Sequence, residues 1–442
     1  MRLLLLAGGS GKRLWPLSNE IRSKIYLTLL PSPDGGKESM IQRICRQVAS
    51  AGLQEQCMIV THNQQAHLTR RQVGGNFPLL TEPHKRGTFS AAALASAYLL
   101  EQLQLPPEEI ICFMPADLYA NDDFFDLIRA MPGALASSGS DLALIGTSPD
   151  HPSSQYGYIV PDPSACNASP ESYPILRFEE KPSPIRAGEL IAEKAYWNCG
   201  VYAFRIGYLM SVMKSLGFPT DYSNFLNCYS SLSELSFDKE VAERCASAII
   251  LPYSGNWVDL GSWGTLTEQL SETITGPGSV SSDSQGTHLV NELELPIHVI
   301  GAGGLIVAAG PEGILVSSKS GSSRIKDQLS QHPQSPLNYE EKAWGSRRVL
   351  DRSETDEVRS VTGKLTLLPG AAYHAKADLQ QWKHWVAVQG SGQWTLQGKS
   401  RTAFPGRTLT ITSGQTHSVF AGAEGMVIIE TVTSVRGDPP GC

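Results

Sequence analysis

The N-terminal segment combines a loop of small residues with a permanent positive charge. Residues 3–6 are four leucines, long enough for a short buried strand. A loop with little side-chain bulk follows, made of Gly8, Gly9, Ser10 and Gly11. Glycines let backbone amides approach a ligand closely, and a phosphate needs several donors at once. Arg13 adds a planar guanidinium that fits phosphate oxygens, so this segment predicts a phosphate site.

Short apolar runs alternate with helical stretches in the first part of the chain. The runs 58–60, 110–114 and 142–145 predict buried strands, and the alanine- and leucine-rich stretch 90–104 predicts a helix. This alternation favours a mostly parallel sheet covered on both faces, in which ligands bind beyond the carboxyl ends of the strands. The glycine loop and Pro115-Ala116-Asp117 each follow a strand directly, so we expect them to share one crevice.

The glycine loop matches neither of two common phosphate-binding patterns. The dinucleotide fingerprint needs G-x-G-x-x-G and the P-loop needs G-x-x-x-x-G-K-[ST], whereas Lys12-Arg13-Leu14-Trp15 follows Gly11 here. The segment resembles the G-G-x-G-x-R-L-x-P signature of sugar-1-phosphate nucleotidyltransferases, and 14–18 is similar to their mannose-1-phosphate guanylyltransferase branch. A plain strand and turn with an exposed arginine is the alternative. The resemblance implies an α/β, Rossmann-like nucleotidyltransferase domain with a mixed, mostly parallel sheet.

Two further segments are implied to bind the nucleotide. Lys24 stands where the family has a lysine that holds phosphate oxygens, although Ser23 and Ile25-Tyr26 depart from the usual Pro-Lys-Gln-Phe. Residues 81–88 are similar to the family's E-P-x-x-R-x-T segment. The resemblance implies that a purine edge is read there by Glu82, Gly87 and Thr88. The alternatives are a surface lysine and a simple turn before a helix.

Two aspartates are implied to hold Mg²⁺. Asp117 ends Phe113-Met114-Pro115-Ala116-Asp117, which is similar to the family's P-A-D-H with leucine in place of histidine. Asp259 lies in 257–263, which resembles W-x-D-V-G-S-W. Mg²⁺ takes one or two carboxylates and completes its shell with water and substrate phosphates. An isolated aspartate at a strand end is more often a turn residue, but two in separate family motifs favour a metal site.

Three more motifs are implied to bind the sugar phosphate. Phe178-Glu179-Glu180-Lys181-Pro182 resembles F-V-E-K-P, in which Glu180 would accept from sugar hydroxyls and Lys181 would pair with the phosphate. Asn198 lies in a W-N-S-G-x-F-like run, and Gly157 lies in Tyr156-Gly157-Tyr158-Ile159, which matches Y-G-Y-I. Each motif alone could be a charged turn, a strand or a hairpin. Their shared order along the chain favours the family assignment.

The composition changes after the first 270 residues. We predict a nucleotidyltransferase domain over 1–270, a linker (271–288) leading into a short β-solenoid-like segment over 271–335, and a cupin-like β domain over 336–442. The last resembles the phosphomannose isomerase module of two-function relatives. Aligned on His384-Trp385, it has Lys376, Asp378 and Lys383 at presumed metal-ligand positions and retains His417, with His374 unassigned. Protonated lysines are poor ligands, so we expect no isomerase activity.

Composition limits the partners. The chain of 442 residues has a formal net charge of −7, which offers no basic surface for nucleic acid. No stretch predicts a membrane span or a signal peptide. The eight cysteines form no C-x-x-C pair, which argues against a zinc site or disulfide framework and favours buried or free thiols in a reducing cytoplasm.

The resemblance implies a reaction in which GTP and mannose 1-phosphate give GDP-mannose and pyrophosphate with Mg²⁺. Arg13 and Lys24 would hold the nucleotide phosphates, and Lys181 would orient the attacking sugar phosphate. The alternatives are another sugar 1-phosphate or nucleotide, a non-catalytic sugar-nucleotide sensor, and a bifunctional enzyme with phosphomannose isomerase activity. A sensor need not keep both metal carboxylates. Assembly into a homo-oligomer is left open.

Overall fold

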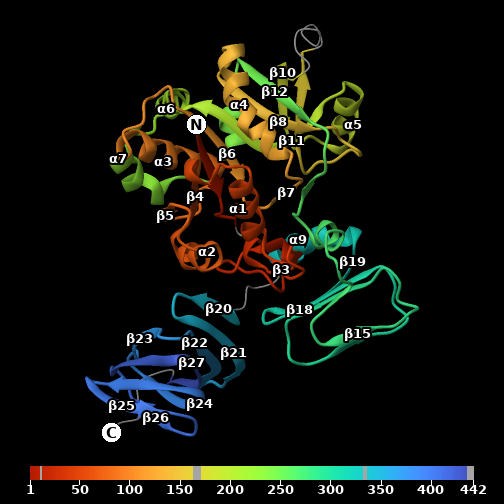
Figure 1. Cartoon of the computed structure of the whole chain (residues 1–442). Coiled ribbons are helices and arrows are strands. Elements are labelled where there is room, and N and C mark those ends of the chain that lie inside the picture. Colours follow the sequence, from red (N-terminus) through yellow and green to blue (C-terminus); the bar gives the residue numbers. More distant parts are fainter. Residues whose placement is uncertain (10–11, 163–170, 332–335, 436–442) are drawn as a thin grey trace. The chain divides into compact units, whose positions relative to one another are not determined.

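A nine-stranded mixed sheet organises the first part of the chain in the computed structural model, which describes residues 1–9, 12–162, 171–331 and 336–435 (Figure 1). The strand order is β5-β4-β1-β6-β11-β8-β12-β10-β9. The bounds are β1 (Arg2–Leu6), β4 (Cys57–His62), β5 (Leu79–Glu82), β6 (Ile110–Pro115), β8 (Leu142–Thr147), β9 (Gly157–Pro161), β10 (Tyr173–Glu180), β11 (Tyr196–Arg205) and β12 (Ala248–Tyr253). The predicted strands 58–60, 110–114 and 142–145 are confirmed in β4, β6 and β8.

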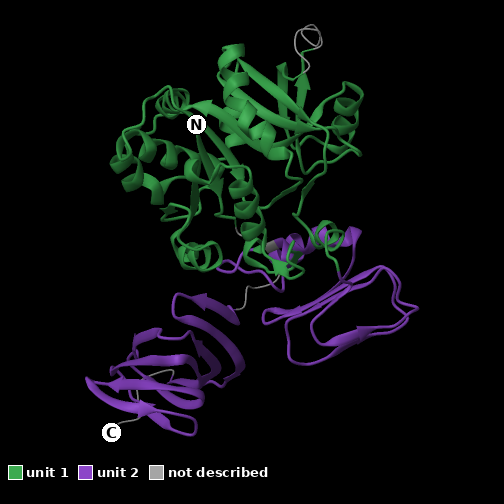
Figure 2. Cartoon of the chain, in the orientation of Figure 1, with its two compact units in different colours: residues 1–10, 24–271 green, residues 11–23, 272–442 purple. Residues whose placement is uncertain are grey.

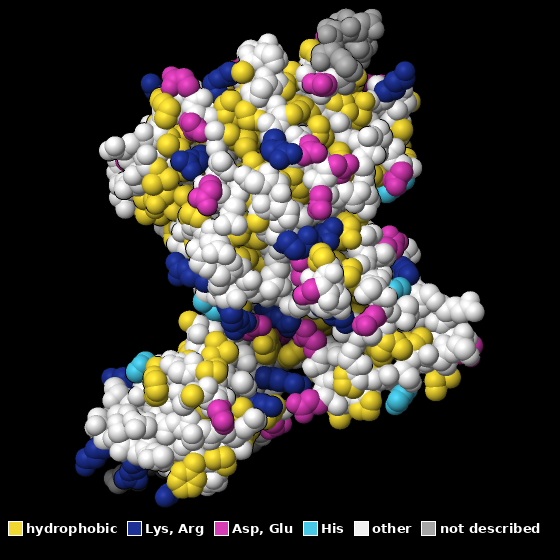
Figure 3. All heavy atoms as spheres, viewed as in Figure 1, with side chains coloured by type: hydrophobic (Ala, Val, Ile, Leu, Met, Phe, Trp, Pro, Cys, Tyr) yellow, Lys and Arg dark blue, Asp and Glu magenta, His cyan; other side chains and the backbone are white. Residues whose placement is uncertain are grey.

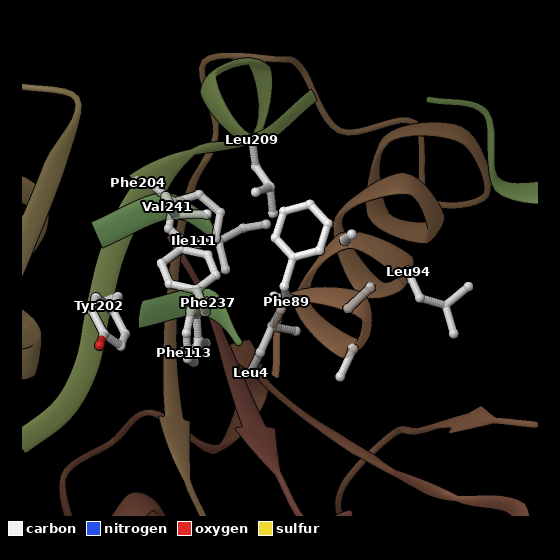
Figure 4. Packing of buried hydrophobic residues seen from close by; sticks show 14 of the residues in the cluster. Leu4, Phe89, Leu94, Ile111, Phe113, Tyr202, Phe204, Leu209, Phe237 and Val241 are labelled. Atoms are coloured by element: carbon white, nitrogen blue, oxygen red, sulfur yellow. The ribbon is translucent and has the colours of Figure 1, made fainter. Parts of the chain in front are cut away.

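Helices cover this sheet and close its core. Their bounds are α1 (Met40–Ser50), α2 (Ala66–Val73), α3 (Gly87–Glu101), α4 (Phe124–Ser138), α5 (Pro184–Ala192), α6 (Ile206–Ser215), α7 (Tyr222–Cys228) and α8 (Trp263–Thr267). The predicted helix 90–104 is α3, which begins three residues earlier. Its small residues are buried almost all round, because it packs against β1, β5, α6 and α7. Figure 4 shows the rings of Phe113, Phe204 and Phe237 meeting in the core beside it.

The ends of β1 and β6 lie side by side, as predicted. These strands are parallel, with Leu6 opposite Pro115, and the amide of Ala116 donates to the carbonyl of Leu6 at 2.9 Å. The glycine loop after β1 and Asp117 after β6 therefore start from the same edge of the sheet.

The second compact unit comprises residues 11–23 and 272–442, and the first comprises 1–10 and 24–271 (Figure 2). It begins with parallel rungs formed by β14 (Ile274–Thr275), β15 (Gly278–Val280), β16 (His288–Asn291), β17 (Ile297–Val299), β18 (Leu305–Gly310) and an antiparallel β19 (Gly313–Ser318). This confirms the solenoid-like segment, but the linker predicted over 271–288 is wrong because β14 and β15 lie within it. Gly276 explains the error: with φ of +88° it passes so close to the Asn291 carbonyl that a Cβ would lie 1.8 Å from its oxygen. The glycine that suggested a linker is required by the solenoid packing.

The C-terminal β domain is antiparallel and confirms the predicted cupin-like fold class. Its strands are β20 (Tyr339–Lys342), β21 (Gly345–Glu354), β22 (Val358–Leu367), β23 (Ala372–Lys376), β24 (Gln381–Leu396), β25 (Lys399–Ala403), β26 (Thr408–Ile411) and β27 (Thr416–Val435), after the helix α9 (Ile325–Gln331). The long strands β24 and β27 pair with each other, and each exchanges its second partner along its length. β24 pairs first with β26 and then with β25, and β27 pairs first with β23 and then with β22. This exchange wraps the sheet around one apolar core centred on Trp385.

The surface charges, the helices and the cysteines are relevant to the partners and the compartment expected from the sequence. Basic and acidic side chains are interspersed on the face of the first unit seen in Figure 3. Within the described ranges, no helix is both long and apolar enough to cross a membrane. Six cysteines of these ranges are free, four of them buried; Cys166 and Cys442 lie outside the described residues.

Candidate active site

Asp117 and Asp259 are brought together by a small antiparallel ribbon. The strands β7 (Leu118–Ala120) and β13 (Trp257–Asp259) pair with Asp259 opposite Leu118, the neighbour of Asp117. Lys24, at the start of the 3₁₀ turn η2 (Lys24–Tyr26), reaches both carboxylates. Its Nζ lies 2.6 Å from Asp117 Oδ2 and 3.8 Å from Asp259 Oδ1. The two aspartates, 142 residues apart in the sequence, therefore lie close enough to contact one cation.

Of these three side chains, the two carboxylates fit a divalent cation that is shared with phosphate, and the Lys24 ammonium does not. All three are only partly exposed, and Lys24 also donates to the carbonyl of Leu260 at 3.3 Å. Two hard carboxylates with open space beside them suit Mg²⁺, which keeps water and substrate phosphates as its other ligands. In the described part of the chain, no cluster of three or more His, Cys, Asp or Glu side chains could hold a metal.

A cavity of about 230 Å³ opens beside the two aspartates. Its lining contains every residue that the motifs assigned to the sugar phosphate, together with both metal candidates: Asp117, Gly157, Glu180, Lys181, Asn198 and Asp259. Tyr156 and Trp257 form part of its wall, with their rings 5.7 Å apart. An aromatic wall beside carboxylate and amide groups can hold the apolar face and the hydroxyls of a sugar.

Glu180 and Lys181 form a charged turn at the end of β10. The Lys181 backbone has φ of +49°, unusual for a residue with a side chain, and its Nζ lies 2.6 Å from Glu180 Oε1. Gly157 is required opposite them, since a Cβ there would lie 2.6 Å from Glu180 Oε2. Burial raises the pKa of Glu180, the charge of Asp238 adds to the rise, and Lys181 opposes it. The exposed Lys181 ammonium is therefore in place to meet an incoming anion.

Asn198 is held by a network that includes Asp238, a residue that the sequence analysis missed. The Asn198 amide nitrogen donates to the Tyr202 hydroxyl at 2.5 Å and to Asp238 Oδ1 at 3.1 Å, while its oxygen accepts from the Gly200 amide at 3.0 Å. Tyr202 also donates to Asp238. Both amide hydrogens are used, so Asn198 can offer a ligand only its remaining oxygen lone pair. A hydroxyl that binds there must act as donor.

Asp238 had no motif to reveal it. It begins the π-helical turn η6 (Asp238–Ala242), in a polar stretch without clear periodicity. The one available signal was the adjacent Phe237, whose ring packs 4.5 Å from that of Phe113 in the core (Figure 4). An aromatic anchor in a polar segment indicates that the segment is docked against the fold.

Glu82, Gly8 and Tyr229 form a second cluster at the neighbouring strand ends. Glu82 closes β5 and is 4% exposed, and its Oε2 accepts from the Tyr229 hydroxyl at 2.6 Å. Gly8 faces the other oxygen, since a Cβ there would lie 2.5 Å from Glu82 Oε1. Burial raises the pKa of Glu82 to about 7, and the Tyr229 hydrogen bond and Lys85 both oppose the rise. This carboxyl is thus an acceptor at the glycine loop that titrates near neutrality.

Gly87 and Thr88 have structural partners. Gly87 has φ of +87°, and a Cβ there would lie 2.1 Å from the Leu235 carbonyl oxygen. The Thr88 hydroxyl accepts from the Phe237 amide at 2.9 Å. Both residues, predicted to meet the nucleotide, thus hold the segment that carries Tyr229 and Asp238.

The remaining residues predicted for the nucleotide phosphates are Gly9, Ser10, Gly11 and Arg13. Gly9 is exposed, whereas Ser10 and Gly11 lie outside the described residues. Arg13 lies in the turn η1 (Lys12–Leu14), half-buried, in the segment that groups with the second unit.

The β domain separates its presumed metal-ligand positions. His374, Lys376 and Asp378 are exposed, whereas Lys383 and His417 are buried. His417 Nδ1 lies 3.1 Å from the Gln415 carbonyl, and burial lowers the pKa of this imidazole. Among the described residues, His374 and His417 line one open cavity of about 340 Å³, whereas Lys376, Asp378 and Lys383 are not part of its lining.

Fold and site together place a cavity lined by carboxylates, an amide and a lysine at the carboxyl ends of the strands, which is where α/β enzymes bind their ligands. Residues 2–275 match the family model described as Nucleotidyl transferase. The chain therefore belongs to the nucleotidyl transferase family, and it is a nucleotidyltransferase.

Relatives agree with this assignment over nearly the whole chain. A mannose-1-phosphate guanylyltransferase of Escherichia coli is 26% identical, with 94% of this chain and 92% of that protein covered. Mannose-1-phosphate guanylyltransferase ManC of Salmonella typhimurium is 28% identical, with 94% and 90% covered. The crystal structure of mannose-1-phosphate geranyltransferase from Thermus thermophilus shares the fold, with a TM-score of 0.61, 24% identity, and 75% and 98% coverage.

Proposed function

We propose that this nucleotidyltransferase joins GTP and mannose 1-phosphate to give GDP-mannose and pyrophosphate. The observation that carries the proposal is the single cavity in which the Asp117–Lys24–Asp259 group adjoins Glu180, Lys181 and Asn198. One end suits phosphates and the other suits a sugar with its own phosphate. Relatives that carry the name mannose-1-phosphate guanylyltransferase over more than nine-tenths of the chain support the choice of substrates.

The reaction requires alignment of two anions more than covalent work by the protein. A phosphate oxygen of the sugar attacks the α-phosphorus of the nucleotide, the bond from this phosphorus to the β-phosphate oxygen breaks, and pyrophosphate leaves. Lys181 pairs with the sugar phosphate and aims its oxygen, while Lys24 and Arg13 offset the charge of the nucleotide phosphates. We expect the glycine loop, Gly8, Gly9, Ser10 and Gly11, to supply backbone donors; Ser10 and Gly11 lie outside the described residues.

The sugar is held by acceptors of two kinds. Glu180 accepts from ring hydroxyls, and Asn198 accepts through the lone pair that its Gly200 contact leaves open. Gly157 leaves room for Glu180 to approach the sugar. On the nucleotide side, Glu82 is the acceptor for the base.

Asp117 and Asp259 would hold Mg²⁺, which when bound supplies charge neutralisation between the nucleotide and sugar phosphates. Lys24 would then be free to turn from the carboxylates toward the nucleotide phosphates. We also place the protein in the cytoplasm, since free and buried cysteines suit a reducing compartment.

A screen for pyrophosphate release tests the substrates. Purified full-length protein is given GTP, ATP, UTP or dTTP with mannose, glucose or galactose 1-phosphate and Mg²⁺. GTP with mannose 1-phosphate should exceed every other pair. A different best pair would replace these substrates, and no release from any pair would favour a non-catalytic sensor.

A further inference from the structure

Tyr229 and Glu82 form a buried pair that joins two distant parts of the chain. Tyr229 opens the 3₁₀ turn η5 (Tyr229–Ser231) and has no exposed surface, whereas Glu82 ends β5 and is 4% exposed. The Tyr229 hydroxyl donates to Glu82 Oε2 at 2.6 Å, and the two residues are 147 positions apart in the sequence. A buried carboxylate is costly unless its oxygens are satisfied, and Tyr229 satisfies only one of them.

The second carboxylate oxygen faces the glycine loop. A Cβ at Gly8 would lie 2.5 Å from Glu82 Oε1, so glycine is needed for this oxygen to stand beside the loop. With Oε2 held by Tyr229, Oε1 is the carboxylate oxygen that stands beside Gly8, where that loop begins.

Tyr229 is itself held in place from two sides. Its ring meets the edge of Phe225 at 5.8 Å. The following residue, Ser230, accepts through its carbonyl from the Arg86 guanidinium, and the Leu235 amide donates to the Arg86 carbonyl at 3.0 Å. Tyr229 thus acts as a fixed donor, because its turn is tied to the loop after β5.

We propose that Tyr229 is a positioning residue for base recognition, holding Glu82 so that its carboxylate meets the ring N–H and amino donors of a guanine base. This inference rests on the use of GTP proposed above. A carboxylate offers only acceptors, which match the two adjacent donors of guanine and not the ring acceptor of adenine. Tyr229 does not touch the base in this account; it acts through Glu82.

The charges around Glu82 make this role measurable. Burial raises the pKa of Glu82 to about 7, whereas Tyr229 and then Lys85 lower it. His62 lies opposite on β4, and burial and then Lys85 lower the pKa of its imidazole. Arg86 lies on the Tyr229 side. Because the hydroxyl favours the ionised carboxyl, its loss should raise the pKa of Glu82 and leave less acceptor form at neutral pH.

The test compares Tyr229→Phe with the wild type in kcat/KM for GTP between pH 6 and 9. We expect a loss of about tenfold at pH 7, the size of a hydrogen bond to a charged group, with recovery at alkaline pH. The acidic limb of the profile should move to higher pH, and KM for mannose 1-phosphate should stay unchanged. Glu82→Gln should remove the limb.

Tyr253→Phe is a matched control, because the Tyr253 hydroxyl donates to Asp123 at 2.8 Å, outside the Glu82 cluster. It should keep the wild-type profile. A wild-type profile in Tyr229→Phe would overturn the inference, as would equal losses for both substrates without a shift in pH dependence. Failure of the wild type to use GTP would overturn the proposed function and the base assignment together.

Discussion

Charged side chains line the cavity of the first unit, and others are packed inside the β domain. Their surroundings in the two places differ. In the cavity, Lys24 lies between Asp117 and Asp259, and Lys181 contacts Glu180 at its rim. In the β domain, Glu430 Oε1 accepts from the Trp385 indole N–H at 3.0 Å, and Glu430 Oε2 lies 3.7 Å from Arg347 Nε. Lys383 has no carboxylate within ion-pair distance among the described residues.

The difference follows from topology. In the first unit, residues from separate motifs stand at the ends of neighbouring strands, so they meet around open space. In the β domain, alternation along β23 and β24 sends His374 and His384 outward and Lys383 inward. Of the described residues that resemble a ligand set, His374 and His417 line a common cavity, whereas Lys376, Asp378 and Lys383 are not part of its lining. We therefore expect the charged residues that border the cavity of the first unit to act on ligands, and the packed ones of the β domain to be structural.

The largest effect on turnover is expected at the two aspartates of the cavity in the first unit. Asp117→Ala or Asp259→Ala should lower Mg²⁺-dependent turnover by roughly 100- to 1,000-fold, because each removes one of two carboxylates from a charge-stabilising site. Asp126→Ala is the control, because this exposed residue on α4 pairs with Arg129 on the same helix, away from the cavity lining. Near-normal turnover in both cavity variants would remove the proposed metal site.

Gly157→Ala tests the shape of the sugar end. The new methyl would lie 2.6 Å from both Glu180 Oε2 and Phe178 Cζ, so Glu180 must shift. Overpacking of this kind should raise KM for mannose 1-phosphate by about tenfold, as measured by initial rates. Gly188→Ala on α5 meets nothing within 4 Å and should behave as the wild type. An unchanged KM in Gly157→Ala would mean that the sugar does not depend on Glu180.

Lys181→Ala and Arg13→Ala should divide the substrates between them. Lys181 contacts Glu180 in the sugar part of the cavity, so its loss should raise KM for mannose 1-phosphate by about tenfold, the effect of one charged hydrogen bond. Arg13→Ala should instead raise KM for GTP. Titration with each substrate measures both values, and equal losses in both variants would refute this division.

The smallest expected effect lies in the β domain. His417→Gln should leave nucleotidyl transfer unchanged, because this imidazole is packed beside Trp385, with ring centroids 5.1 Å apart. The wild type should not interconvert fructose 6-phosphate and mannose 6-phosphate with added Zn²⁺, Mn²⁺ or Co²⁺, since two lysines stand at ligand positions. Metal-dependent conversion that disappears in the variant would show a working isomerase site.

The sequence predicted best the residues whose motifs lie on regular strands or at their ends. Asp117, Gly157 and Glu180 lie at strand ends, where local pattern and fold agree, and they reach one cavity. Tyr229 and Asp238 lie in an irregular stretch, and their partners are far away in the sequence. Only tertiary packing brings such a segment to a site, and the aromatic Phe237 next to Asp238 was its one local signal.

Composition misled at one boundary for a physical reason. The Ser-, Thr- and Gly-rich residues after 270 suit a linker, yet small residues are also what a tight solenoid needs. Gly278 has φ of +144°, and a Cβ there would lie 2.1 Å from the Ile297 carbonyl oxygen. The same composition thus predicts either structure, and parallel pairing with β17 decides between them.

The fate of oxygen atoms tests the central claim most directly. Full-length protein is incubated with GTP, Mg²⁺ and mannose 1-phosphate labelled with ¹⁸O in its phosphate, and both products are analysed by mass spectrometry. Direct attack of the sugar phosphate on the α-phosphorus predicts GDP-mannose that retains all of the label and pyrophosphate that carries none. Label in pyrophosphate, or no GDP-mannose at all, would contradict the account.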